Sequence, residues 1–231
     1  MKPKLYFLAL VWLACSSGSA LAGRPLQTED AGVLDRGACE FEAAAQRLRQ
    51  GGASDSDSAL QVGCGIGANT QLALALARSG AAGGSERGLA INGKTSLWRA
   101  AGEAVPALVL AYSVAAARVP GGGWDHAGML LQLVHSRPLG EALTLHANLG
   151  HERDQRAREG RTRWGLALEH AGFGSLAPMA ELTGDDRQAP WWNLGLRLTL
   201  APEKVFVDAA YGRQVVGQRP ALASVGLKLA F

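Results

Sequence analysis

Apolar residues alternate with small or polar ones along many segments of this sequence, and this period of two restricts the fold more than any other feature. The chain ends in SVGLKLAF, where every second residue counted back from the final phenylalanine is apolar. The same alternation runs through QLALALA at 71–77, TLHANLG at 144–150 and WNLGLRLTL at 192–200. A period of two is typical of a β-strand with one apolar and one polar face. The sequence therefore predicts an all-β protein.

Strand-like segments bounded by turn residues follow one another along most of the chain. An even number of antiparallel strands brings both ends of the chain to the same side. We expect about twelve strands, with roughly ten to fourteen as the range that such weak signals allow. Their predicted positions are 39–49, 59–66, 70–78, 87–99, 105–118, 125–136, 141–151, 161–170, 174–184, 191–200, 205–213 and 221–231.

The connections between these segments also alternate in character. One set, which includes GGASDSDS, SGAAGGSERG and RDQRAREGR, is long and polar, whereas the other, which includes GAN, RPLG and APEK, is short. Transmembrane barrels with short periplasmic turns and longer external loops have this rhythm. A soluble β-sandwich gives no reason for it. We therefore predict a transmembrane antiparallel up-and-down β-barrel whose last strand closes against the first.

The first residues predict export. MKPK supplies positive charge, LYFLALVWLA is an apolar core too short to span a bilayer, and Ala20-Leu21-Ala22 offers the small residues that a signal peptidase needs. We expect residues 1–22 to be a cleaved signal peptide, 23–38 a periplasmic N-terminal segment and 39–231 an outer-membrane barrel. Whether the segment 23–38 hangs in the periplasm or plugs the lumen is left open by the sequence.

Two cysteines, Cys39 and Cys64, lie outside the predicted signal peptide. They fall on the first and second predicted strands, on the apolar side of each. An exported protein meets an oxidising environment, in which a disulfide between neighbouring strands can form. A Cys39–Cys64 disulfide and two free cysteines are both compatible with the spacing.

Aromatic residues gather near the strand ends, as amphipathic rings do at the two interfaces of a membrane barrel. If the first strand runs outward, one belt lies at the periplasmic ends and the other at the external ends. The strand register leaves open that Trp98 and Phe206 point inward. The predicted girdle residues are Phe41, Trp98, Phe206 and Phe231 on the periplasmic side and Trp124, Trp164, Trp191, Trp192 and Tyr211 on the external side.

Charged and polar residues on the opposite faces of the strands predict a polar lumen, because charge on the lipid face is costly. They carry both signs, so they either line a narrow pathway for solutes or pair across the lumen as a stabilising network. The candidates are Glu40, Glu42, Lys94, His146, Asn148, Arg163, Glu169, Glu181, Arg197, Asp208 and Lys228.

Other chemistries find little support. The net charge of +3 and the lack of a basic stripe interleaved with aromatics exclude a nucleic-acid partner. His146 and Asn148 share a face, but the adjacent His135 and Ser136 point to opposite faces and cannot act together in catalysis. No cysteine or histidine pair has ligand spacing, so we expect no metal and no cofactor.

The segment RPLQTEDAGVLDRGACEFEA, at 24–43, resembles the start of a family of outer-membrane proteins labelled as meta-pathway phenol-degradation or transporter proteins. The shared residues are Arg24, Pro25, Leu26, Thr28, Glu29, Asp30, Ala31, Gly37, Glu40 and Glu42. The resemblance implies an outer-membrane barrel that passes small molecules, aromatic ones among them, and it carries no catalytic residues. Phe231 with its alternating neighbours also resembles the end of bacterial outer-membrane barrels, where it is a signal for the barrel-assembly machinery.

These observations favour a passive channel for small, aromatic or hydrophobic solutes rather than an enzyme. A non-conducting structural or interaction barrel is the main alternative, and an outer-membrane lipid hydrolase comes third. The expected partners are outer-membrane lipid, lipopolysaccharide, the barrel-assembly machinery and a solute that the sequence does not identify.

Overall fold

The structure, a computed structural model, describes residues 25–81, 84–98, 107–217 and 219–231. The predicted signal peptide, residues 1–22, lies outside the described residues. Within the described ranges there is no helix with the length and hydropathy to cross a membrane. The strands are β1 (Cys39–Gln50), β2 (Ala53–Gly67), β3 (Thr70–Ala81), β4 (Gly84–Trp98), β5 (Ala107–Arg118), β6 (Asp125–Pro138), β7 (Leu143–Asp154), β8 (Glu159–His170), β9 (Leu176–Asp185), β10 (Trp191–Ala201), β11 (Val205–Gln214) and β12 (Ala221–Ala230).

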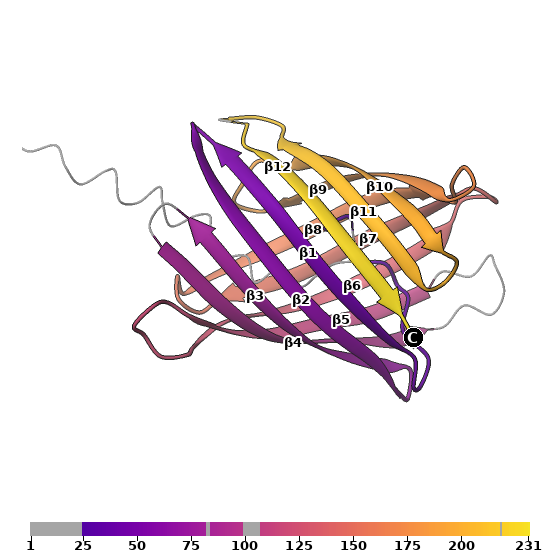
Figure 1. The fold of residues 1–231 in the computed structure, drawn as a ribbon, viewed down its shortest axis with the longest axis horizontal. Helices are drawn as coiled ribbons and strands as arrows, with labels where there is room; N and C mark the ends of the chain where they lie inside the picture. Colours follow the sequence, from indigo (N-terminus) through magenta and orange to yellow (C-terminus); the bar gives the residue numbers. More distant parts are fainter. Residues whose placement is uncertain (1–24, 82–83, 99–106, 218) are drawn as a thin grey trace, which may run out of the picture.

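All twelve strands form one closed antiparallel barrel in which each strand pairs with its neighbours in sequence (Figure 1). The ring closes where β1 pairs with β12, with Ala43 opposite Leu227. The predicted twelve-stranded up-and-down barrel is therefore confirmed. We call the end at which β1 begins and β12 ends the terminal end, and the opposite end the distal end.

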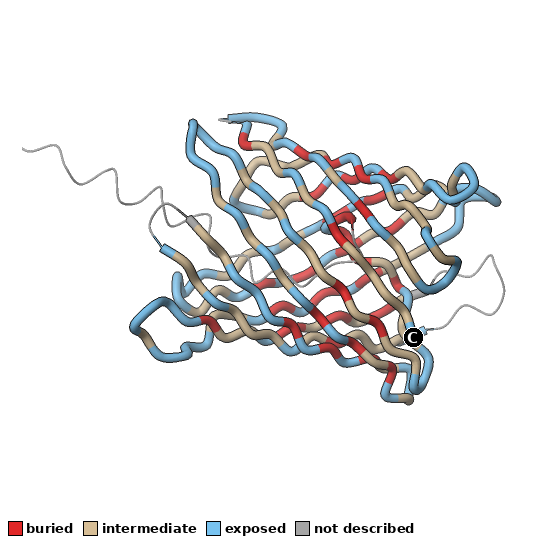
Figure 2. Tube along the Cα trace, in the orientation of Figure 1, coloured by how far each residue is buried: buried red, intermediate tan, exposed pale blue. Residues whose placement is uncertain are grey.

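The wall of the barrel is inverted relative to that of a soluble protein. Leu74 on the outer surface is 52% exposed, whereas Glu42 on the inner surface is only 3% exposed. Buried and exposed positions alternate along most strands (Figure 2). A strand sends successive side chains to opposite faces, so a period of two in the sequence gives an apolar exterior and a polar lumen. This is the pattern of a barrel that faces lipid.

The distal ends of β2, β3 and β4 extend into segments that were expected to be long loops. GGASDSDS contributes only Gly51 and Gly52 to a turn, at φ angles of 56° and 88°, and its remaining residues belong to β2. Polar cross-strand contacts stabilise this extension, for example the hydrogen bond of 2.9 Å from Gln46 Nε2 to Asp57 Oδ2. The prediction of long polar loops is therefore wrong at the β1–β2 and β3–β4 hairpins. There the polar residues belong to strands that continue beyond the apolar band of the wall.

Cys39 and Cys64 form a disulfide, with their Cα atoms 4.1 Å apart. They stand directly opposite each other on β1 and β2. The backbone of Cys39 exchanges its hydrogen bonds with Phe231 on the other side, at 2.8 and 2.9 Å, so its pair with Cys64 is the close, non-hydrogen-bonded type. Of the two states left open by the sequence, the structure has the oxidised one.

Seven of the predicted girdle residues lie on the outer wall or in the connections. Trp98 does so because a bulge between Ser96 and Trp98 shifts the register and turns its side chain to the outer side, opposite Leu108. The seven are Phe41, Trp98, Trp124, Trp164, Trp192, Tyr211 and Phe231.

Phe206 and Trp191 were predicted for the girdle and lie on the inner face instead. Phe206 has the parity of the buried Asp208, and its ring lies 5.8 Å from the guanidinium carbon of Arg197 inside the barrel. Trp191 has the parity of the buried Asn193, and the register between them is regular. The alternation of the strand fixes both positions.

Candidate functional site

The N-terminal segment, from Pro25 to Ala38, enters the barrel and crosses its lumen. Near the terminal end it pairs with the inner face of β2, where Arg36 bridges to Gly65. Deeper inside, Leu26 packs against Ala167 of β8 and Met179 of β9. Of the two positions left open for this segment, the lumen and not the periplasm is observed.

Glycines on the inner wall leave room for the segment. A Cβ atom on Gly65 would lie 2.1 Å from the backbone oxygen of Asp35. On β10, a Cβ on Gly195 would lie 2.7 Å from Cγ of Pro25. Real Cβ atoms do not approach other atoms so closely, so any side chain at either position would displace the segment. The wall and the segment are thus complementary in shape.

Glu181 on β9 is the main polar anchor of the segment. Its carboxylate accepts the backbone N–H of Gln27 at 2.8 and 3.0 Å, the N–H of Thr28 at 2.8 Å and the Thr28 hydroxyl at 2.7 Å. The Nδ2 of Asn193 also donates to it, at 2.8 Å. A buried carboxylate needs such donors, and hydrogen bonds to a charged acceptor are the strong ones.

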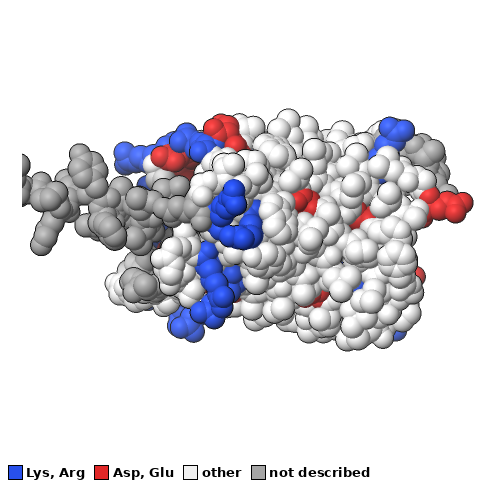
Figure 3. Space-filling model, turned by 90° about the horizontal axis from the view of Figure 1, so that it is seen from above, with Lys and Arg blue, Asp and Glu red and all other residues white. Residues whose placement is uncertain are grey.

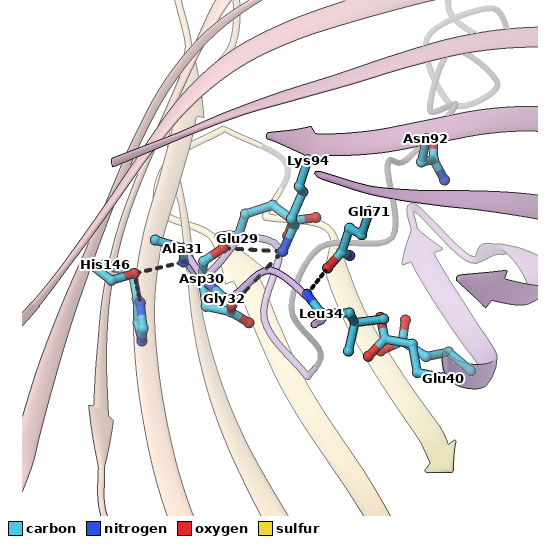
Figure 4. Close-up of polar contacts among 12 residues, drawn as sticks. Glu29, Asp30, Ala31, Gly32, Leu34, Glu40, Gln71, Asn92, Lys94 and His146 are labelled. Carbon is cyan, nitrogen blue, oxygen red and sulfur yellow. Dashed lines mark hydrogen bonds and ion pairs between the residues drawn. The ribbon is translucent and has the colours of Figure 1, made fainter. Parts of the chain in front are cut away.

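Lys94 on β4 is the second anchor (Figure 4). Its ammonium group forms an ion pair with Glu29, donates to the backbone oxygen of Asp30 at 3.1 Å and lies 3.9 Å from the Asp30 carboxylate. Burial raises the pKa of the Glu29 carboxyl, although the positive charge of Lys94 acts to lower it. Burial also acts to raise the pKa of Asp30, but Lys94, the N–H of Gly32 and more distant positive charges lower it to about 2. Asp30 is therefore the permanently charged partner of Lys94.

A third anchor joins three strands. Ser136 on β6 accepts the backbone N–H of Ala31 at 2.8 Å, and its hydroxyl lies 2.7 Å from Nδ1 of His146 on β7. The other ring nitrogen of His146 lies 3.4 Å from Glu169 on β8. Ser136 was not a predicted site residue; its position opposite His146 across the β6–β7 turn was the available signal. Because the hydroxyl is occupied by the segment, this group of residues holds the segment in place.

Beside the segment, a cavity of about 230 Å³ remains in the lumen, next to β1–β6 and β12. Its wall includes Lys228, which forms an ion pair with Glu40 at 2.5 Å and lies 3.6 Å from Glu42. Gln71 faces it from β3 and accepts the backbone N–H of Leu34 at 2.8 Å. The space left open in the lumen is thus bordered by charges of both signs.

All eleven predicted lumen residues have inward-facing positions. Asn148 accepts the backbone N–H of Glu29 at 2.6 Å once its amide is oriented to satisfy its neighbours. Arg163 pairs with Glu152 at 2.9 Å, and Asp208 is buried in the wall. The structure therefore brings Lys94, His146, Asn148 and Glu181 together around the segment. That these eleven residues determine which solutes pass stays a prediction.

The part of the chain that the structure describes has no group of three His, Cys, Asp or Glu side chains arranged to hold a metal ion.

The fold, with its apolar exterior and polar lumen, is that of the porin-like β-barrels. The chain belongs to the family described as Uncharacterised conserved protein UCP029691, whose model matches residues 9–231.

Solved structures of outer-membrane barrels have the same fold at low sequence identity. The KdgM porin in complex with disordered oligogalacturonate is 8% identical, with a TM-score of 0.65 over 83% of this chain and 99% of that chain. The NanC porin is 9% identical, with a TM-score of 0.57 over 82% and 98%. The COG4313 outer membrane channel from Pseudomonas putida F1 is 14% identical, with a TM-score of 0.58 over 87% and 98%.

No curated protein matches the sequence. The expected class, an outer-membrane type of barrel, is confirmed by these matches. The phenol-degradation label is carried by none of the matches described above.

Proposed function

We propose that this protein is an outer-membrane channel for passive diffusion of small polar solutes, and that its N-terminal segment holds the lumen narrow. The observation that carries the proposal is the polar, charge-lined lumen inside a wall whose outer face is apolar. The similarity in fold to the KdgM and NanC porins supports it. The terminal end of the barrel, where β1 begins and β12 ends, would face the periplasm, with Phe231 available to the assembly machinery.

The lining of the cavity favours polar solutes over the aromatic or hydrophobic ones first expected. The apolar part of the open space includes Tyr112 and Leu130, and the rest borders Glu40, Glu42 and Lys228 together with amide side chains. An apolar solute would strip water from these groups without replacing their hydrogen bonds. A small solute with hydroxyl, carboxyl or amine groups could exchange partners with them.

The segment sets the size limit. A cavity of about 230 Å³ has room for several water molecules, at roughly 30 Å³ for each in the liquid. The segment also crosses from the wall at Gly65 to the wall at Gly195, so it divides the lumen. Solutes larger than a few heavy atoms would pass only when the segment leaves its place.

Conductance in planar bilayers tests the proposal. We expect small channel events from the wild type and larger ones from a variant that lacks residues 25–34. Heat-modifiable mobility on gels, fast when unheated and slow when boiled, would show that both proteins are folded barrels. If both are folded and neither conducts nor admits sugars into liposomes, the channel proposal is wrong.

A non-conducting interaction barrel is the second candidate, and one observation favours it. The segment is held by apolar packing as well as by polar anchors: Ala31 belongs to a buried cluster with Val109 and Val134. A segment fixed on both counts would keep the lumen shut. Conductance from the deletion variant alone, with none from the wild type under any condition, would support this candidate.

A further inference from the structure

Charges of opposite sign are sorted to opposite faces of the wall in the distal part of β1–β5. Every outward-facing charged residue there is an arginine, and every acidic residue of these strand portions faces the lumen. The outward arginines are Arg47, Arg49, Arg78, Arg87 and Arg118, all of them exposed, and the inward acids are Asp55, Asp57 and Glu86.

Three of these arginines stand side by side on adjacent strands. Arg78 on β3 is directly opposite Arg87 on β4, and Arg87 is directly opposite Arg118 on β5. Residues so paired have Cβ atoms about 5 Å apart, and like charges at this spacing destabilise a sheet. We call Arg78, Arg87 and Arg118 the arginine row.

The described residues offer no carboxylate to offset this repulsion. None of their Asp or Glu side chains forms an ion pair with the arginine row. Within the row, Arg118 donates to the backbone oxygen of Gly122 at 2.9 Å, which leaves its charge uncompensated. An anion from outside the protein would lower the electrostatic energy of this arrangement.

The arginine row lies where the lipid-facing surface ends. One cross-strand row closer to the middle of the barrel, the outer face presents Leu76, Leu89 and Ala116, and the next row presents Leu74, Ile91 and Val114. Adjacent rows on one face are about 7 Å apart along a strand, so the guanidinium groups lie at the level of lipid head groups. On the face seen in Figure 3, which is not the face of β3–β5, Lys and Arg side chains also gather in a band toward the distal end, beside a largely uncharged surface.

We propose that the arginine row binds the phosphate groups of lipopolysaccharide in the outer leaflet. This inference rests on the outer-membrane location and the orientation proposed above. Guanidinium groups bind phosphate oxygens in a fork geometry that fixes both partners. Because the row is on the outer side of the wall, a solute in the lumen does not reach it, and a membrane lipid does.

Binding of lipid A to the purified, detergent-solubilised protein tests this proposal. The triple variant Arg78→Gln/Arg87→Gln/Arg118→Gln is expected to bind bisphosphorylated lipid A about 100-fold more weakly, since each basic residue at an anionic membrane surface contributes roughly fivefold. A matched control, Arg158→Gln/Arg187→Gln/Lys204→Gln, loses the same three charges away from the row and should bind like the wild type. Native mass spectrometry or microscale titration gives the affinities.

Three further arms make the result decisive. Dephosphorylated lipid A should bind the wild type as weakly as the triple variant binds lipid A. Phosphatidylglycerol and millimolar inorganic phosphate should compete poorly. The variant Arg78→Lys/Arg87→Lys/Arg118→Lys keeps the three positive charges and should retain part of the affinity. That result would show that the glutamine variant loses affinity through its lost charges and not through misfolding. Equal binding by wild type and triple variant, or equal binding of phosphatidylglycerol, would overturn the proposal. Conductance measured on the same samples reports on the channel separately.

Discussion

The carboxylate of Glu181 accepts both the backbone N–H and the hydroxyl of Thr28, at 2.8 and 2.7 Å, across 153 residues of sequence. This relationship ties the N-terminal segment to the far wall of the lumen. It also places a negative charge where four donors converge, from Gln27, Thr28 and Asn193. The segment is therefore held by an acceptor that no neutral side chain reproduces.

Replacing Glu181 with glutamine is expected to release the segment. The amide keeps one acceptor oxygen but turns an NH₂ group toward backbone N–H donors, and a charge-assisted hydrogen bond contributes roughly 1.5–3 kcal/mol. The docked population should fall about 10- to 100-fold. The readout is the labelling rate, with a bulky maleimide, of a cysteine introduced as Val33→Cys. Glu159→Gln, at an exposed distal position, should leave that rate unchanged.

Lys94 and Glu29 are expected to be energetically coupled. Lys94→Met leaves two carboxylates of the segment without their partner, which costs roughly 3–5 kcal/mol of docking free energy for a buried pair. Adding Glu29→Gln should recover part of this cost, so the double variant is less impaired than the sum of the single ones. A double-mutant cycle on the same labelling rates measures the coupling. Strict additivity would mean that the ion pair does not hold the segment.

Gly65→Ala is expected to push the segment off the wall at its point of entry. The new Cβ would lie 2.1 Å from the backbone oxygen of Asp35, and backbone cannot give way as a flexible side chain can. Gly80→Ala is the matched control, because its Cβ would meet the nearest atom at an ordinary 3.6 Å. We expect larger channel events from the first variant only. Identical conductance of the two variants would contradict this.

The pKa shifts of the segment predict that mild acid does not open the lumen. The pKa of Glu29 is raised in the docked state, so docking strengthens as the pH falls through that raised pKa toward 4.5. The pKa of Asp30 is lowered from 3.8 to about 2, so its stabilising contribution is complete above pH 3.8 and is lost only between pH 3.8 and 2. Conductance should therefore not rise between pH 7 and 5. A rise there that Asp30→Asn abolishes would refute the assignment.

The barrel and the polarity of its two faces could be predicted from the sequence because both depend on alternation alone. A strand sends neighbours to opposite faces, so alternation alone predicts that Glu42 and Lys228 face the lumen, where their charged groups lie 3.6 Å apart. Nearness to a strand end places Phe206 and Trp191 in the girdle, but their parity, which already left an inward Phe206 open, puts both on the inner face.

The path of the N-terminal segment could not be predicted, because residues 25–38 have no periodicity and form no continuous strand. Its anchors depend on contacts between residues far apart in sequence, from 64 positions for Lys94 with Asp30 to 105 for Ala31 with Ser136 and 153 for Thr28 with Glu181. The Ser136–His146 pair required the exact register across the β6–β7 turn, and a shift of one residue would have sent one of the two side chains outside.

The disulfide between Cys39 and Cys64 is expected to stabilise the barrel without being needed for its closure. The bond joins residues 25 positions apart that the β1–β2 ladder already holds together, and a disulfide contributes typically about 2–4 kcal/mol. Closure depends on the backbone pairing of β1 with β12, and Cys39 takes part in it through its backbone hydrogen bonds to Phe231, which do not need the sulfur atom. The double variant Cys39→Ser/Cys64→Ser should therefore keep the fast unheated band on gels and convert to the slow band at a lower temperature. Loss of the fast band at room temperature would mean that the bond is required for the barrel to form.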